Sequence, residues 1–219
     1  MPKLNPRYVC VYLVLAAIAV VSPSVLAGEF KGEANFFFGW KMLDEDDWAL
    51  YQSDGTGPLY SLDDQAAFGA ELTWGSTSWP VAIASDLFWS MEIANSGLDD
   101  TYAWTMEFDP GVRKVWELGR IRPYAAGGLG LIFGGVNLDC LPEGPFLCQF
   151  EGDSGNDKEV TVGAWLNAGV TYRIGGKFNI GASTRWSTGG DLDIHGVERN
   201  PGGFQIGLLL GFGWPKYQK

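Results

Sequence analysis

The chain has 219 residues, with 26 acidic and 15 basic side chains, a formal net charge of −11 and ten tryptophans. The length suits one domain of ordinary size. The acidic balance excludes nucleic acid as a partner, because phosphate backbones require a basic protein face.

The first 27 residues have the layout of a secretory signal peptide. Two basic residues precede an uncharged run from Tyr8 to Val21, and small residues lead up to Ala27. The uncharged run is shorter than the roughly 20 residues that a transmembrane helix needs. We predict cleavage after Ala27, so that residues 1–27 are the signal peptide and residues 28–219 the mature domain.

Eight segments of the mature chain alternate between two kinds of residue with a period of two, which is typical of β-strands. The clearest are Val160–Arg173 and Phe204–Trp214. The others are Glu33–Met42, Phe68–Trp74, Trp79–Trp89, Tyr102–Phe108, Leu129–Phe133 and Phe178–Trp186, with a bulge expected at Pro110-Gly111. Several segments reach the length that crosses a membrane at a tilt, whereas soluble strands commonly have about five or six residues.

The connections between these segments alternate between short and long. The short ones are Gly75–Ser78, Gly119–Ile121 and Gly175–Lys177, and the long ones are Asp44–Asp64, Glu92–Asp100, Gly134–Lys158 and Gly189–Gly202. Outer-membrane barrels have short periplasmic turns and long outer loops. We predict an all-β fold, namely an eight-stranded antiparallel up-and-down transmembrane β-barrel that is closed by pairing of the first and last strands.

Aromatic residues gather at the ends of the predicted strands. One end carries Trp74, Trp79, Trp116, Tyr172 and Trp214, and the other carries Trp40, Trp89, Trp104 and Trp186. Such rings favour the headgroup layers of a membrane, so they predict two aromatic girdles.

The alternation also predicts charged residues inside the barrel. The acids are Glu33, Glu71, Asp86 and Glu107, and the bases are Lys41, Arg173 and Arg185. A paired network would fill an interior of this size, because eight strands leave room for little more than side chains. The alternative is a narrow or gated conduit through the network. The tight turns and strand bases are expected to carry Arg113, Lys114, Arg120, Arg122 and Lys177.

Two stretches resemble the small outer-membrane β-barrel family that includes the opacity proteins. One is the Pro-Tyr and Gly-rich stretch Arg122–Gly130, and the other is the closing segment Gly202–Trp214. The resemblance implies eight antiparallel strands and an outer-membrane location, reached through the signal peptide. It implies no single shared activity.

The long loops carry 18 acidic residues against Lys158 and Arg199. These carboxylates either stay solvated or hold divalent cations that bridge to lipopolysaccharide phosphates. Cys140 and Cys148 are the two cysteines of the mature chain and are expected to form a disulfide. His195 is the only histidine and lies in a loop, and we find no catalytic motif, metal-binding spacing or cofactor fingerprint.

These observations favour a non-enzymatic outer-membrane barrel with acidic surface loops, which contributes to envelope structure or binds at the surface. The alternative is a small porin-like or ligand-conducting barrel, and a lipid A-modifying hydrolase is a distant third. We expect a monomer without a cofactor, surrounded by outer-membrane lipid and lipopolysaccharide.

Overall fold

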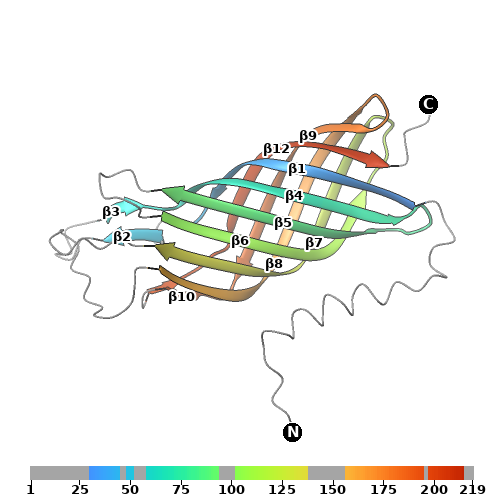
Figure 1. The fold of residues 1–219 in the computed structure, drawn as a ribbon. Helices are drawn as coiled ribbons and strands as arrows, with labels where there is room; N and C mark the ends of the chain where they lie inside the picture. Colours follow the sequence, from blue (N-terminus) through green and yellow to red (C-terminus); the bar gives the residue numbers. More distant parts are fainter. Residues whose placement is uncertain are drawn as a thin grey trace, which may run out of the picture.

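The computed structural model describes residues 30–44, 48–51, 58–93, 102–137, 156–194 and 197–214. Eight long strands form one closed barrel in the order β1-β12-β9-β8-β7-β6-β5-β4 (Figure 1). These strands are β1 (Phe30–Met42), β4 (Asp64–Ser76), β5 (Ala82–Ile93), β6 (Tyr102–Val115), β7 (Ile121–Asn137), β8 (Asn156–Ile174), β9 (Phe178–Gly189) and β12 (Gly203–Trp214). Two short hairpins, β2 (Ala49–Tyr51) with β3 (Pro58–Ser61) and β10 (Leu192–Ile194) with β11 (Val197–Arg199), lie in the connections.

The first and last barrel strands close the sheet by antiparallel pairing. Gly32 pairs with Trp214 at one end of this seam, and Met42 pairs with Phe204 at the other. β1 also pairs with β4 on its other side, so it has no free edge. Closure satisfies the backbone groups that an open edge would leave exposed to lipid. The predicted fold class and its closure are confirmed.

The barrel strands are long and their connections differ at the two ends. The strands have between 12 and 19 residues, more than the roughly 9 to 11 that cross a bilayer at a tilt. Segments 77–81, 116–120 and 175–177 make the tight connections, and Gly119 and Gly175 adopt φ values of 68° and 58° there. We call this the turn end of the barrel and the opposite one the loop end. The third long loop is shorter than predicted, because β7 and β8 extend into the range assigned to it.

The two faces of each strand have opposite characters. Leu208 is 66% exposed on the outer surface, whereas Leu209 beside it is completely buried in the lumen. The same alternation gives the barrel a continuous apolar outer band, which a soluble monomer would not expose to water. Among the described residues, no helix has the length and hydropathy to cross a membrane.

The expected bulge at Pro110 is absent, because the register between β6 and β7 is the same before and after this residue. Pro110 has no N–H with which to join the ladder. The indole of Trp165, on β8, supplies a donor at this point of the ladder. Its Nε1–H donates to the carbonyl oxygens of Pro110 and Leu129, at 3.3 Å each. Gly111 makes room for the ring, since a Cβ there would lie 2.7 Å from the indole.

Candidate functional site

Ten charged side chains of the barrel strands are buried in the lumen, and their formal charges balance. They include the seven residues predicted to face inward, and the structure adds Asp109, Arg113 and Arg122. The acids are Glu33, Glu71, Asp86, Glu107 and Asp109, and the bases are Lys41, Arg113, Arg122, Arg173 and Arg185. A buried charge is costly without a counter-charge, so a closed lumen requires such a balanced set.

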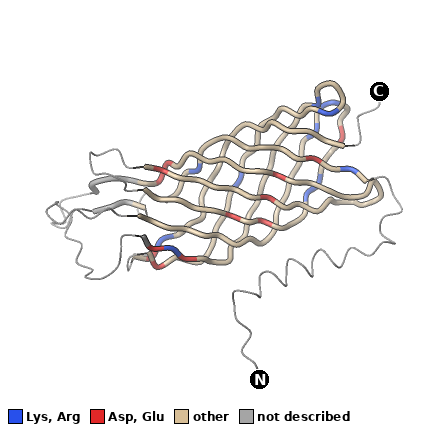
Figure 2. Tube along the Cα trace, in the orientation of Figure 1, with Lys and Arg blue, Asp and Glu red and all other residues tan. Residues whose placement is uncertain are grey.

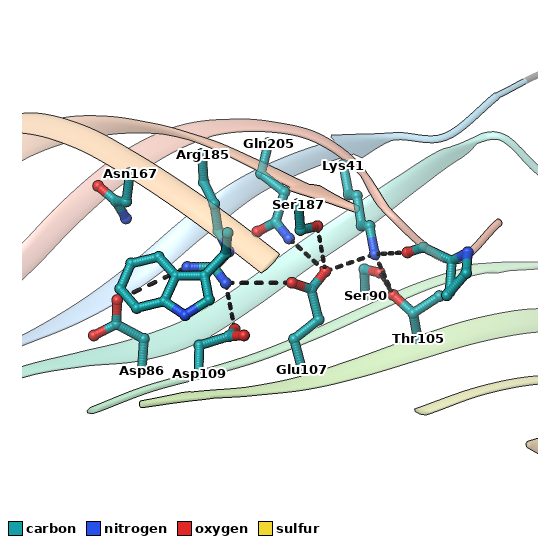
Figure 3. A network of polar contacts seen from close by, with 12 residues as sticks. Lys41, Asp86, Ser90, Thr105, Glu107, Asp109, Asn167, Arg185, Ser187 and Gln205 are labelled. Atoms are coloured by element: carbon teal, nitrogen blue, oxygen red, sulfur yellow. Dashed lines mark hydrogen bonds and ion pairs between the residues drawn. The ribbon is translucent and has the colours of Figure 1, made fainter. Parts of the chain in front are cut away.

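Glu107 is the centre of a network of polar contacts in the lumen (Figure 3), and it lies in the half of β6 that is nearer the loop end. Its carboxylate accepts hydrogen bonds from Lys41 Nζ at 2.7 Å and from Arg185 Nη2 at 3.3 Å. It also accepts from Ser187 Oγ at 3.2 Å and from Gln205 Nε2 at 3.1 Å. One carboxylate thereby links β6 to β1, β9 and β12 across the lumen.

Arg185 fills the neighbouring level of the lumen. Its guanidinium forms an ion pair with Asp109 and lies between two rings, with centroid distances of 4.7 Å to Phe88 and 4.6 Å to Trp165. Cation–π contacts of this kind add to the ion pair when both groups are removed from water. The combination places an arginine side chain at the middle of the barrel.

Arg113 is buried in the part of the lumen between Arg185 and the turn end. Its guanidinium donates to Asp86 Oδ2 at 2.6 Å and lies 3.5 Å from Glu71 Oε2. Glu71 also accepts from the Tyr124 hydroxyl at 2.7 Å and from Asn167 Nδ2 at 2.9 Å. Charged and neutral donors thus contact both oxygens of the Glu71 carboxylate.

A second charge cluster closes the lumen at the turn end. Glu33 forms ion pairs with Arg122 and with Arg173, the latter at 2.6 Å. Arg122 also reaches Glu117 at 3.2 Å, and Glu117 pairs with Lys31 at 3.1 Å. Partial burial acts to raise the pKa of Glu117, but the Lys31 hydrogen bond and the nearby positive charges bring that pKa below its ordinary value.

An apolar cluster covers the lumen at the loop end, and we call it the cap. It consists of Leu43, Trp48, Leu62, Ala103, Val136, Leu192 and Ile194. The indole of Trp48 donates to the Asn200 carbonyl at 2.8 Å and lies 5.7 Å below the Arg199 guanidinium. Lys41 Nζ donates to the Pro201 carbonyl at 2.7 Å, which ties this loop to the charge network.

Seven of the nine predicted girdle residues lie within the barrel strands, and Trp79 and Trp116 lie in the tight connections at the turn end. Of the nine, Trp79 and Trp104 are half-buried and the others are exposed on the outer surface. Trp74 and Trp214 both pair with Gly32, so they lie at one level of the turn end. At the other end, Trp186 pairs with Phe204.

The sequence pattern missed three members of the interior network and the whole cap. Arg122 has the same parity as the inward-facing Tyr124, and Asp109 and Arg113 have the parity of Glu107, so an extended alternation would have found all three. The cap does not stand out in the sequence, because its few apolar residues lie in long loops that are rich in acidic ones. The apolar pair Leu192 and Ile194 within the fourth loop is the signal that was available.

The described residues offer little for catalysis or ligand binding. A pocket of about 50 Å³ opens at the turn end beside Lys31, Glu33 and Trp79. That volume is far below the roughly 300 to 1,000 Å³ of typical ligand sites. No group of three or more His, Cys, Asp or Glu in the described part could hold a metal ion. Cys140, Cys148, His195 and the predicted signal peptide lie outside the described residues.

No protein-family model and no curated protein sequence matches the chain. Among solved structures, 17 chains match. Ail, the attachment invasion locus protein of Yersinia pestis, is 13% identical over 85% of this chain and 99% of its own, with a TM-score of 0.53. Ail in complex with the heparin analogue sucrose octasulfate gives 12% identity, the same coverages and a TM-score of 0.52. Neisserial surface protein A is 14% identical over 86% of this chain and 97% of its own, with a TM-score of 0.49.

The chain therefore has the fold of the small outer-membrane β-barrels with eight strands. This is the architecture that the resemblance to the opacity-protein family implies. At these identities the likeness concerns the fold, and the task of the protein has to be argued from its own lumen and loops.

Proposed function

We propose that the protein is a non-enzymatic, closed barrel of the Gram-negative outer membrane, which presents acidic loops at the cell surface. The filled lumen is the observation that carries this proposal. Side chains occupy the lumen along its whole length. From the turn end to the loop end these are Glu33 with its arginines, Arg113 with its carboxylates, Arg185 between its two rings, Glu107 with its donors, and the cap. A conduit would have to break several of these contacts at once.

Export to this membrane follows from the predicted signal peptide. Removal of residues 1–27 would leave a mature chain that begins at Gly28. Mass spectrometry of protein purified from outer membranes tests this step, because the uncleaved chain is heavier by the mass of the leader. Detection of the full-length chain in the outer membrane would contradict it.

The loop end supports a surface role with an acidic character. Among the described residues there, nine acids are exposed or half-buried, whereas Lys158 is the single exposed base and Arg199 is buried beside Trp48. A sulfated ligand such as the one bound to Ail would be repelled by this surface. The loops therefore suit a cationic partner, or lipopolysaccharide phosphates bridged by divalent cations.

Conductance in planar bilayers tests the closed lumen directly. The refolded mature protein should give no stable single-channel steps, whereas a general porin inserted under the same conditions serves as the positive control. The Trp48→Ala variant should stay silent too, because the charge network still fills the barrel below the cap. Stable steps from the wild-type protein would instead support a conducting barrel.

Lipid A chemistry is tested separately in cells. Mass spectrometry of lipid A with and without expression of the protein should give identical spectra. A loss of acyl chains that depends on expression would contradict the non-enzymatic proposal.

A further inference from the structure

We propose that the turn end of the barrel carries a basic collar that binds the phosphate groups of anionic glycerophospholipids in the surrounding leaflet. The collar consists of Lys114, Arg120 and Lys177, which are all exposed. They come from three places around the rim, namely the end of β6, the β6–β7 turn and the β8–β9 turn. The inference rests on the charge of this end, on its position beside lipid-facing aromatic rings and on the direction of the side chains.

The two ends of the barrel have opposite charge. The exposed or half-buried charged residues described at the turn end are Lys31, Lys114, Arg120 and Lys177, with Glu117 as the acid. Those described at the loop end are Asp44, Asp63, Asp64, Glu92, Asp157, Glu159, Asp191, Asp193 and Glu198, with Lys158 as the base. Figure 2 shows charged residues at both ends of the barrel. An anionic leaflet is therefore favoured at the turn end, whereas at the loop end it requires bridging cations.

Lys114 lies on the outer surface of the barrel, not in its lumen. It shares the outward parity of Val112 and Trp116, whose side chains are 53% and 46% exposed, whereas Arg113 between them is buried. Its amine donates to the Pro80 carbonyl at 2.7 Å, at the tight β4–β5 connection. The apolar stem thus runs along the lipid-facing wall and the charge sits at its edge, as expected of a lysine that reaches from lipid toward headgroups.

Arg120 and Lys177 repeat this arrangement around the rim. Arg120 Nη1 donates to the Tyr172 hydroxyl at 3.4 Å, and the Tyr172 ring is exposed on the lipid-facing surface. Lys177 directly precedes Phe178, whose ring is also exposed there. Arg120 is therefore hydrogen-bonded to a residue of the girdle, and Lys177 is the chain neighbour of another exposed ring at the same end, so both lie near the aromatic level that marks the headgroups of the bilayer.

This placement favours a lipid over a soluble anion. The phosphate of a glycerophospholipid lies at the level of the girdle. Its acyl chains continue from there toward the middle of the bilayer, along the apolar outer wall that includes Val112. A free phosphate would gain the charge contact but no apolar contact. The collar therefore selects lipids with a net negative headgroup over zwitterionic ones, since both have the same chains and differ in charge.

Lipid retention tests the collar in the intact mature barrel. The protein is refolded in vesicles of equal parts phosphatidylcholine and phosphatidylglycerol, extracted in mild detergent and examined by native mass spectrometry. The wild-type protein should retain phosphatidylglycerol in excess over phosphatidylcholine. Each removed cation should lower this excess about fivefold, equivalent to about 1 kcal/mol for a basic residue near an anionic surface.

The test variant combines Lys114→Gln, Arg120→Gln and Lys177→Gln, and Lys158→Gln at the loop end is the matched control. The triple variant should retain both lipids equally, and the control should behave as wild type. Heat-modifiable gel migration establishes that each protein is folded, and Lys177→Gln alone serves if the triple variant does not fold. Equal retention by the wild type, or an unchanged excess in the folded variant, would overturn the proposal.

Inorganic phosphate separates a lipid site from a simple anion site. Added phosphate should leave the phosphatidylglycerol excess at the value found in chloride of the same ionic strength. Displacement of the lipid by phosphate, beyond the effect of chloride, would show that the collar recognises the anion alone and would also overturn the proposal.

Discussion

Removal of the charge on Glu107 is the sharpest test of the network that fills the lumen. In the Glu107→Gln variant, Lys41 keeps two neutral acceptors, the Thr105 hydroxyl at 2.8 Å and the Pro201 carbonyl at 2.7 Å. Its counter-charge at 2.7 Å is lost, while Arg185 keeps the ion pair with Asp109. The variant thus leaves one completely buried ammonium group without its carboxylate.

The expected loss in the free energy of unfolding is about 3 to 5 kcal/mol, the range for breaking a buried ion pair by removing one partner. Lys41→Met should lower the free energy of unfolding by a comparable amount, because Glu107 then keeps only Arg185 as a positively charged partner. The double variant removes both charges and should be more stable than the sum of the single losses predicts, by about 1 to 3 kcal/mol.

Urea unfolding in phospholipid vesicles, followed by tryptophan fluorescence and by heat-modifiable migration, measures these values. Asp191→Asn is the matched control, since it replaces an exposed carboxylate by an amide at the loop end. The control should change the unfolding free energy by less than about 0.5 kcal/mol. A loss below about 1 kcal/mol for Glu107→Gln, or strictly additive losses in the double variant, would refute the reasoning.

Three further outcomes are expected. Trp165→Phe should cost roughly 1 to 3 kcal/mol in the same unfolding assay, because two backbone carbonyls lose the indole donor, and an unchanged midpoint would count against that role. Stability linked to Glu117 should be present above the ordinary glutamate pKa of about 4.3 and be lost at lower pH, so Glu117→Gln should flatten the pH dependence there, and equal slopes would contradict the Lys31 pairing. Protease added to intact cells should cut within 138–155 and spare the turn 77–81, and the reverse pattern would mean that the barrel is oriented the other way.

The strand pattern could be predicted because a barrel wall separates two environments at every residue. Side chains alternate between lipid and lumen along a strand, so Leu208 and Leu209 differ in exposure although they are identical in type. The aromatic ends, the tight turns and the closure of β1 on β12 follow from the same local pattern. The sequence thus determined the number and order of the strands and which faces meet lipid, whereas β6 and β7 are longer than the segments Tyr102–Phe108 and Leu129–Phe133 that the pattern indicated.

Tertiary structure alone decided which charged residues pair and which residues cover the loop end of the lumen. The Arg113 pair with Asp86 joins residues 27 positions apart, and the Lys41 pair with Glu107 joins residues 66 positions apart. Their contact depends on the stagger of the strands around the closed barrel, which no single segment encodes. The cap likewise needs Trp48 and Leu192 to meet above the lumen, although they lie in two loops that are far apart in the chain. Local alternation fixes the direction of a side chain, but only closure of the barrel fixes its partner.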